Sequence, residues 1–305
     1  MSLDIRPLTD GDLEPLRALI TAPGVDAQFD KFQGAGGLGR MLGDPHLFPG
    51  AVRLAFLGDE PAGFAITYLL PHDDAPFAMH RLGVRQEFRR QGIGAALLAH
   101  AQAWAGTQTH RPVAEQATSA WVPEPAAEAL AARAGYTHER WYWLMERPRG
   151  GTIEPAWPAG VSARAWDGSD AMLEAAIAAY NDSFAQHHRF VRGRVSTLRH
   201  LMTREGDTPA QLCVAYRDGE AVGFCRCERF SLRGEIAVLG TTHAARGLGL
   251  GRALLRWGVR WLEANSATPI TLLVDGENEN ALRLYQSDGF AIIRTRRVWA
   301  WRPPA

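Results

Sequence analysis

The sequence predicts an α/β protein that contains two copies of one domain, each folded around a mixed β-sheet. The chain has 305 residues, which is more than one domain of about 100–200 residues usually contains. Two segments with the same pattern, RRQGIGAALL from Arg89 and ARGLGLGRALL from Ala245, lie in its two halves. Strand-like and helix-like segments alternate in the same order in both halves. These three observations indicate a duplicated domain.

Further matches between the two halves support the duplication. Arg89 and Arg246 lie 157 residues apart (246 − 89). Three other pairs are separated by similar intervals, from 154 to 160 residues: Arg6 and Arg164, Gly63 and Gly223, and Gly135 and Gly289. A nearly constant interval indicates a repeat with small insertions. We therefore predict an N-terminal domain at residues 1–148, a linker rich in Pro and Gly at residues 149–160, and a C-terminal domain at residues 161–305.

The predicted elements follow the same order in both halves. Each half begins with a strand and a helix that a preceding Asp or Ser can cap, and continues with a hairpin whose turn contains Asp, Gly or Glu. A strand then runs into the glycine-rich segment and a second helix, and a strand, a helix and a strand complete the half. In the first half these elements cover residues 5–8, 13–20, 52–69, 94–105, 111–122, 126–135 and 136–147. In the second half they cover residues 162–166, 171–181, 211–230, 251–265, 270–275, 280–289 and 290–301.

Composition excludes several classes of protein. Lys plus Arg and Asp plus Glu both number 33, so the balanced charge gives no electrostatic reason to expect nucleic-acid binding. No apolar run reaches the roughly 18–20 residues that cross a bilayer, and the first residues lack a signal-peptide pattern. We therefore expect a cytoplasmic protein with no membrane or nucleic-acid partner. Cys225 and Cys227 alternate on one strand without a second ligand pair at metal spacing, so we expect buried packing there and no metal site.

Each glycine-rich segment has the sequence expected of a turn that binds phosphate. The first backbone N–H groups of a helix have no intrahelical partner, and the helix dipole makes that end positive. Glycines let the backbone approach an anion, and Arg89 or Arg246 adds charge-assisted hydrogen bonds. Neither segment is a Walker loop, because the required Lys is missing. A dinucleotide-binding loop fits the second segment only partly, since Gly251 comes one position early, and the first segment has two glycines.

A third class of phosphate loop matches both segments. Residues 89–94 and 246–251 resemble the acyl-CoA loop of the GCN5-related N-acetyltransferase (GNAT) family, Arg/Gln-x-x-Gly-x-Gly/Ala. Five residues of NENALRLYQSDGF also resemble the C-terminal signature of this family: Asn278, Ala281, Tyr285, Gly289 and Phe290. The resemblance covers nearly the whole chain and extends to the tandem, mycothiol-synthase-like subgroup of the family. It implies two tandem GNAT-like acyl-CoA N-acyltransferase domains, acetyl-CoA as the cofactor and a small-molecule amine as the acceptor.

The resemblance also implies catalytic residues in the second half. Direct attack of an amine on a thioester requires a base for the amine and an acid for the leaving thiolate. Tyr285 occupies the position of the family's acid, and its usual pKa of about 10 keeps it protonated at neutral pH. Glu235, on the strand before the loop, occupies the position of the base, for which a water chain or His243 is the alternative. His187 and His188 follow the helix that borders the acceptor in this family and are candidates for contact with it.

Cofactor-binding residues are implied in both halves. The strand before the loop is expected to pair its backbone with the pantetheine amides, and the loop is expected to hold the pyrophosphate. In the second half the residues are Leu239, Gly240, Thr241, Arg246, Gly247, Leu248, Gly249, Leu250, Gly251, Arg252 and Asn278. In the first half the residues are Leu82, Val84, Arg89, Arg90, Gln91, Gly92, Ile93, Gly94 and Ala95.

The interval between the halves predicts that only the second half is catalytic. The first half has other residues at three corresponding positions: Ala78 for Glu235, Ala131 for Tyr285 and Glu124 for Asn278. Alanine cannot transfer a proton. His80, which shares a strand face with Ala78, is the one alternative base. We therefore predict an N-acetyltransferase site in the C-terminal domain and an N-terminal domain that binds CoA or keeps the loop for structural reasons.

Two other functions remain open from the sequence. A catalytically weak protein that binds or senses acyl-CoA would keep the phosphate loops without turnover. Mycothiol synthesis itself would require a pocket for a cysteinyl pseudodisaccharide. The two halves can pack as an internal pseudo-dimer, so a monomer and a homodimer are both compatible with the sequence.

Overall fold

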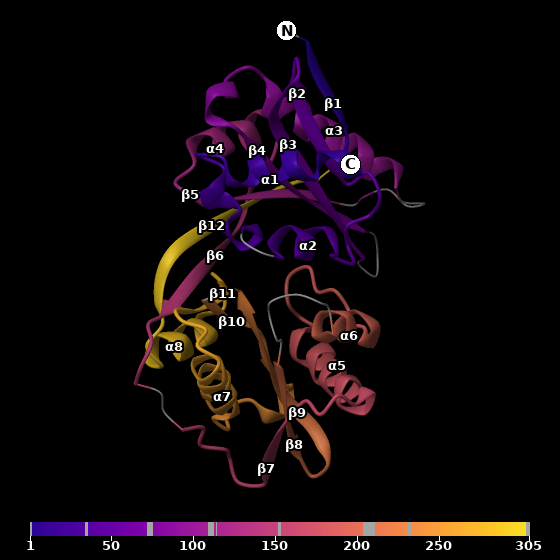
Figure 1. Cartoon of the computed structure of the whole chain (residues 1–305). Coiled ribbons are helices and arrows are strands. Elements are labelled where there is room, and N and C mark those ends of the chain that lie inside the picture. Colours follow the sequence, from indigo (N-terminus) through magenta and orange to yellow (C-terminus); the bar gives the residue numbers. More distant parts are fainter. Residues whose placement is uncertain are drawn as a thin grey trace. The chain divides into compact units, whose positions relative to one another are not determined.

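The computed structural model of the chain describes residues 2–33, 36–71, 76–108, 113, 115–151, 154–203, 211–230 and 233–302. They form two compact units, shown in Figure 1: unit 1 contains Met1–Tyr142 and Thr295–Ala305, and unit 2 contains Trp143–Arg294. Both units combine helices with a mixed sheet, which confirms the predicted fold class. Most of residues 111–114, where a strand is predicted to begin, and residues 152–153 of the predicted linker lie outside the described residues.

The predicted helices and strands occur in the predicted order in both halves, and each half has a further helix, which was not predicted, between its first helix and its hairpin. The first half contains β1 (Leu3–Pro7), η1 (Asp10–Asp12), α1 (Leu13–Thr21), η2 (Asp26–Gln28), η3 (Asp30–Phe32), α2 (Gly37–Leu42), β2 (Val52–Leu57), β3 (Glu60–Leu70), β4 (Phe77–Val84), η4 (Gln86–Phe88), α3 (Ile93–Thr107), β5 (Glu115–Val122), α4 (Pro125–Arg133) and β6 (Thr137–Arg147). The second half contains β7 (Val161–Ala165), α5 (Asp170–Phe184), α6 (Val195–Thr203), β8 (Gln211–Arg217), β9 (Glu220–Phe230), β10 (Arg233–Thr241), η5 (His243–Ala245), α7 (Leu250–Ala264), β11 (Ile270–Asp275), α8 (Glu279–Ser287) and β12 (Ala291–Trp301).

The two sheets have the same arrangement of strands. In unit 1 the order is β1-β2-β3-β4-β5-β12, and in unit 2 it is β7-β8-β9-β10-β11-β6. The first four strands of each unit are antiparallel neighbours. The fourth and fifth strands, β4 with β5 and β10 with β11, are parallel. A parallel pair needs a crossover connection, and α3 or α7 supplies it directly after the glycine-rich loop.

The last strand of each half completes the sheet of the other unit. β12 pairs antiparallel with β5 from Thr295, opposite Val122, to Trp301, opposite Gln116. In the other direction, β6 lies beside β11, and Met145 is fully buried in the core of unit 2. The two units therefore depart from the predicted boundaries at residues 148 and 161, because the final strands are exchanged between the halves.

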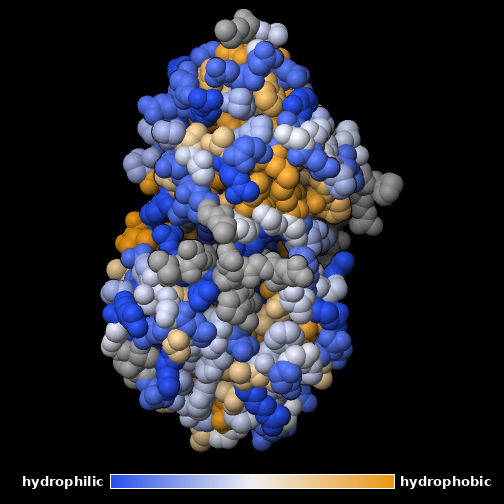
Figure 2. Space-filling model, viewed as in Figure 1, coloured by the Kyte–Doolittle hydropathy of each residue, from blue (hydrophilic) through white to orange (hydrophobic). Residues whose placement is uncertain are grey.

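Helices cover both faces of each sheet. In unit 2, Figure 1 shows α7 and α5 on opposite faces of β8 to β10, and each face has its own apolar core. A Cβ on Gly234 would meet Leu262 of α7, whereas a Cβ on Gly240 would meet Phe184 of α5, because the register of β10 on β9 shifts between these two glycines. In Figure 2 the visible face of unit 1 carries a patch of apolar side chains among polar ones. None of the described helices is long and apolar enough to cross a membrane.

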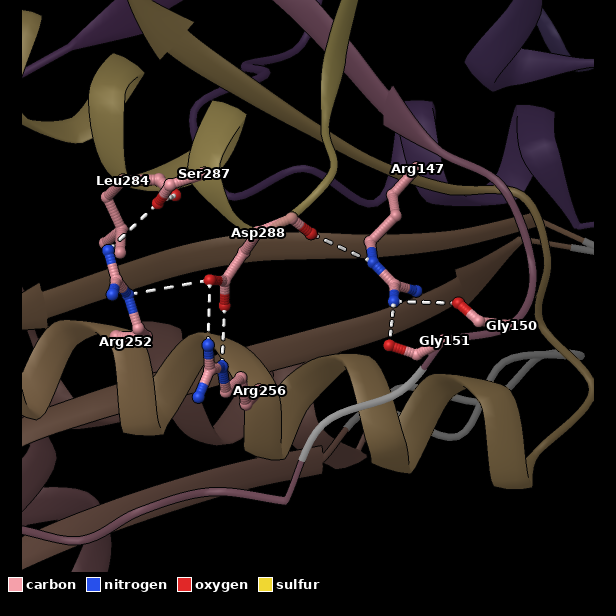
Figure 3. A network of polar contacts seen from close by, with 8 residues as sticks. All are labelled: Arg147, Gly150, Gly151, Arg252, Arg256, Leu284, Ser287 and Asp288. Carbon is pink, nitrogen blue, oxygen red and sulfur yellow. Dashed lines mark hydrogen bonds and ion pairs between the residues drawn. The ribbon is translucent and has the colours of Figure 1, made fainter.

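Arg147, at the end of β6, forms hydrogen bonds with the segment that follows it in unit 2, at Gly150 and Gly151. As Figure 3 shows, its guanidinium donates hydrogen bonds to the carbonyl oxygens of Gly150 and Gly151, at 2.8 and 3.0 Å, and to the carbonyl oxygen of Asp288, at 3.1 Å. It also pairs with the Glu263 carboxylate of α7 at 3.0 Å. Because its side chain is only 10 % exposed, these bonds are poorly screened by water and hold the predicted linker against α7 and the end of α8.

Candidate functional site

In unit 2, β10 and β11 separate next to the glycine-rich loop. Their described parallel pairing extends only from Gly234, opposite Ile270, to Ile236, opposite Leu272. Both strands continue beyond this point, and β10 remains paired with β9 as far as Thr241. The edge of β10 that faces β11 therefore leaves the ladder over its last residues. Such an edge offers backbone N–H and C=O groups to an extended ligand.

A β-bulge lies at this separation. The register between β10 and β9 shifts between Ile236, opposite Cys227, and Val238, opposite Arg226, so Ala237 is an additional residue. A bulge bends its strand and is common beside functional sites. In unit 1, the register of β4 on β3 is regular from Gly63, opposite Val84, to Leu70, opposite Phe77. The two repeats thus differ in backbone at the position before the loop.

Because of the bulge, the residue of the first half that corresponds to Glu235 differs from the one that the sequence interval predicts. Glu235 lies opposite Thr271 on the parallel strand, and Thr271 corresponds to Ala117 at the interval of 154 (271 − 117) that relates the ends of the halves. Ala117 lies opposite Met79. The structural counterpart of Glu235 is therefore Met79 and not Ala78, because a constant interval cannot account for the additional residue. Methionine has no proton to donate or accept, so the first half still lacks a base at this position.

Glu235 is buried on the α5 face of the sheet, with 9 % of its surface exposed. Its neighbours Gly234 and Ile236 both face α7, so the alternation of the strand turns Glu235 to the opposite side. Glu228 of β9 lies directly across from it and is also buried, and Arg226 forms an ion pair with Glu228. This face therefore carries the Glu235 carboxylate beside the ion pair of Arg226 and Glu228. Arg226 and Glu228 are not among the residues predicted from the sequence, although their alternation on one strand is visible there.

Tyr285 lies on α8, on the other face of the sheet. It is 9 % exposed and belongs to the same apolar cluster as Ile236, the residue after Glu235. Burial raises the pKa of its phenol well above the usual value, with a smaller contribution from Cys225. Within the described residues its hydroxyl makes no hydrogen bond. Tyr285 is therefore a protonated donor at neutral pH.

The glycine-rich loops of both units begin their helices with the same backbone conformation. Gly249 is the N-cap of α7 with φ +82°, and Gly92 is the N-cap of α3 with φ +81°. Gly247 has φ +78°, and Arg90, its counterpart, has φ +65°. A left-handed residue other than glycine costs about 1–2 kcal/mol. Unit 1 therefore retains the loop conformation even where it no longer has the glycine.

Several predicted binding residues in unit 2 have partners within the protein. Asn278 is the N-cap of α8, and its side-chain oxygen accepts from the Ala281 N–H at 3.1 Å. Arg252 donates to Ser287 Oγ at 2.9 Å and lies 3.5 Å from the Asp288 carboxylate, as Figure 3 shows. Both side chains thus have structural roles next to the loop, and the loop backbone remains the exposed part of the predicted phosphate site.

Two loop residues connect the phosphate loop to α5. Arg246 donates to the Ser183 carbonyl oxygen at 3.2 Å. The His243 backbone N–H donates to Asp182 at 2.7 Å, and its ring Nδ1 lies 3.3 Å from the same carboxylate. The first of these bonds is the main cause of the lowered pKa of Asp182. His243, the alternative base, is therefore bound to an ionised carboxylate on the protein surface. His187, a candidate for acceptor contact, packs against Phe184 with ring centroids 4.6 Å apart.

Unit 1 contains a cavity of about 520 Å³ at the equivalent place. Its walls come from α3, α4, the segment before η2, and the ends of β4 and β5. All of the cofactor-binding residues predicted in the first half line it, with the exception of Gln91: Leu82, Val84, Arg89, Arg90, Gly92, Ile93, Gly94 and Ala95. As in unit 2, the parallel pairing next to it stops early, at His80 opposite Thr118, although β4 continues to Val84. We call this cavity the N-terminal cleft.

His80 is not available as a base. It is fully buried, with Nδ1 3.0 Å from the Thr67 hydroxyl and Nε2 2.8 Å from Oε1 of Gln116. Burial lowers its pKa to about 4. Because Gln116 Oε1 can only accept, Nε2 carries the proton and Nδ1 accepts from Thr67. This finding corrects the prediction that His80 is an alternative base, since both ring nitrogens are already bonded within the core.

Among the described residues of unit 1, alanine takes the place of Tyr285. Ala131 is fully buried among apolar residues at the corresponding position of α4. The equivalence is firm in the backbone, because Tyr136 N–H bonds to the Ala131 carbonyl as Phe290 N–H bonds to the Tyr285 carbonyl. The hydroxyl of Tyr136 accepts from Gln102 at 3.0 Å, and burial raises its pKa. The glycine-rich turn is therefore duplicated, whereas the two candidate proton-transfer groups are not.

Comparisons with known proteins identify the family. The sequence profile of the Acetyltransferase (GNAT) family matches residues 21–136 and 171–290, one match in each half. The chain therefore belongs to the GNAT family of acetyltransferases and is an N-acetyltransferase. Within it, the chain is 34% identical to mycothiol acetyltransferase of Kineococcus radiotolerans over 260 residues, which cover 78% of this chain and 82% of that protein. It is also 34% identical to mycothiol acetyltransferase of Thermobispora bispora, with 78% and 79% covered.

Solved structures share the tandem fold. A tandem GNAT protein from the clavulanic acid biosynthesis pathway superposes with a TM-score of 0.76 at 19% identity, and all of both chains is covered. A GCN5-related N-acetyltransferase from Sphaerobacter thermophilus has a TM-score of 0.75 at 21% identity, with 99% of this chain and 97% of that chain covered. At these identities the comparison establishes the fold only.

Proposed function

We propose that the protein transfers the acetyl group of acetyl-CoA to a small-molecule primary amine at a single active site in the C-terminal repeat. The observation that carries this proposal is the coincidence of three features in unit 2. The parallel strands separate beside the phosphate loop, a buried Glu235 lies at the bulge, and a buried, protonated Tyr285 lies on the helix beyond. Unit 1 has the first feature and lacks both side chains.

The residues fit acetyl-CoA on geometric grounds. The loop at Gly247 and Gly249 has open space where side chains would be, so a pyrophosphate can approach the backbone. The free edge of β10 suits the two amides of the pantetheine arm. When bound, acetyl-CoA supplies a thioester carbonyl that an amine can attack. Bound in this way, its thioester end would point toward the separation between β10 and β11.

Two side chains perform the proton transfers in this proposal. Glu235, directly or through one water, accepts the proton that the amine must lose. The Tyr285 hydroxyl gives its proton to the leaving sulfur. Arg226 forms an ion pair with Glu228 beside Glu235, so an incoming ammonium group would meet a polar, charged face.

In this proposal the N-terminal cleft binds CoA without turnover. Its loop has the same backbone conformation as the loop of the C-terminal repeat, and its size suits part of a cofactor. Met79 and Ala131 occupy the positions of base and acid. Binding of acyl-CoA without catalysis, the alternative function that the sequence left open, would then apply to the N-terminal repeat alone.

For the acceptor, the relatives provide one candidate. Both are mycothiol acetyltransferases, so we include a cysteinyl pseudodisaccharide in the panel of amines to be tested. The charged face formed by Arg226, Glu228 and Glu235 suits a polar acceptor that carries an ammonium group. Amino sugars and simple primary amines complete the panel.

Release of the CoA thiol with this panel tests the one-site assignment. Tyr285→Phe keeps the buried ring and removes the proton, so we expect it to lower kcat by about 10²-fold or more. Arg89→Glu places a negative charge at the phosphate loop of unit 1 and serves as the matched control, and we expect kcat to remain near the wild-type value. Loss of turnover in Arg89→Glu together with normal turnover in Tyr285→Phe would place catalysis in the N-terminal repeat instead.

A further inference from the structure

An ion pair spans the N-terminal cleft at its phosphate loop. Nη1 of Arg89 lies 3.6 Å from the Glu124 carboxylate, and both residues line the cavity. Arg89 begins the glycine-rich segment after β4, whereas Glu124 directly precedes α4. The side chains are 30% and 21% exposed, so water screens the pair only in part. The pair therefore connects the two walls between which a nucleotide would enter.

Arg89 is held in this position by two further hydrogen bonds. Its Nη2 donates to the Gly24 carbonyl oxygen at 2.6 Å, and its Nε donates to the Val84 carbonyl oxygen at 3.2 Å. Three edges of the guanidinium are thus occupied by a carboxylate and two carbonyls. A phosphate group that approaches the loop would therefore have to compete with the Glu124 carboxylate for the guanidinium of Arg89.

The C-terminal repeat lacks this ion pair. Asn278 stands at the position of Glu124, carries no charge, and turns its oxygen onto the N–H of Ala281 in its own helix. Glu124 makes no such capping bond to α4. The amide of Asn278 therefore caps its helix, whereas the carboxylate of Glu124 at the equivalent position pairs with the loop arginine, Arg89. At this position the N-terminal repeat therefore has a negative charge that the C-terminal repeat lacks.

We propose that Glu124 determines the affinity of the N-terminal cleft for CoA, by occupying Arg89 with a carboxylate that phosphate groups would otherwise replace. The inference rests on the proposed function, which assigns CoA to this cleft. CoA carries several negative charges, and its phosphate groups compete with Glu124 for the Arg89 guanidinium. The cleft is then a second, weaker CoA site that fills only after the C-terminal site.

Calorimetric titration with CoA, which permits no turnover, tests this inference on the full chain. For the wild type we expect one tight and one weaker site. Glu124→Gln keeps the size of the side chain and removes its charge, so the weaker site should gain at least tenfold in affinity. Glu124→Asn, which restores the residue of the other repeat, should give the same gain. Addition of Arg89→Gln to Glu124→Gln should remove it, because no guanidinium remains to be released.

A matched control lies on the same helix. Glu128 pairs with Arg297 at 3.1 Å and does not line the cavity, so Glu128→Gln changes the same net charge without touching the ion pair and should leave both sites unchanged. Equal affinity of the N-terminal site in wild type and Glu124→Gln, or a gain that persists with Arg89→Gln, would overturn the inference while leaving the proposed function intact. A single CoA site in every variant would instead overturn the assignment of CoA to this cleft and the inference with it.

Discussion

Glu235 and His80 are buried polar side chains on equivalent strands, yet their surroundings give them different roles. His80 is bonded at both ring nitrogens, to Thr67 and Gln116 within the core. Glu235 lies on a face that already contains a paired carboxylate, Glu228, and its single arginine. A residue whose hydrogen bonds are satisfied within the core stabilises the fold, whereas a buried carboxylate at a strand separation is suited to exchange a proton. The sequence shows both residues but neither the strand separation nor the hydrogen bonds of His80.

The lowered pKa of His80 predicts that stability depends on pH. The unfolded chain binds a proton at this residue near pH 6.5, while the folded chain does not until about pH 4. Stability is therefore fully present above pH 6.5 and is lost as the pH falls toward 4. Between pH 7 and pH 5 this residue alone should cost about 2 kcal/mol.

Urea unfolding of wild type and His80→Gln at the two pH values measures this contribution. Glutamine fills the same space with a neutral amide that does not titrate. We expect the wild type to lose about 2 kcal/mol more than the variant between pH 7 and pH 5. The same loss in both proteins would show that other groups carry the acid sensitivity of unit 1.

At the scale of elements, the order of strands and helices was predictable, because the repeat doubles every signal. The N-cap serine before α5 and the glycine-rich starts of α3 and α7 lie where the sequence places them. The bulge in β10 was not predictable, since one additional residue in a strand leaves the hydrophobic alternation readable on either side. It is this bulge that shifts the counterpart of Glu235 from Ala78 to Met79. The occupied side chains of Asn278 and Arg252 likewise follow from the fold and not from the motif.

Capping by Asn278 makes a prediction about α8, the helix that carries Tyr285. Asn278→Ala removes the acceptor for the Ala281 N–H and should lower stability by about 1 kcal/mol. Asn278→Ser restores a capping oxygen and should recover that stability, with a KM for acetyl-CoA close to the wild-type value. Thermal unfolding and initial rates measure the two effects separately. A serine variant with wild-type stability and a strongly raised KM would assign Asn278 to the cofactor, as the motif alone suggests.

At the scale of the molecule, the sequence could not indicate that the halves exchange their last strands. β6 and β12 have the same length, and each follows a strand and a helix in its own half, β5 and α4 or β11 and α8. Which sheet a strand joins depends on the path of the chain after it, which local periodicity does not encode. In the structure, residues from Thr295 complete the sheet of unit 1, and Trp299 is buried there beside Ala131 and Tyr136. The fold of the N-terminal repeat therefore includes the end of the chain.

This exchange predicts that the N-terminal repeat does not fold on its own. A fragment of residues 1–142 leaves β5 as an exposed edge and removes Trp299 from its core, so it should aggregate or remain unfolded. Addition of a peptide of residues 290–302 supplies the missing strand and should restore a soluble complex with the amide protection of a folded sheet. The same peptide with Val298→Asp and Trp299→Asp should fail, because it would bury two carboxylates in an apolar core. A soluble, folded fragment without the peptide would mean that β12 adds to a sheet that is already complete, and the terminal strand would then be dispensable for the N-terminal repeat.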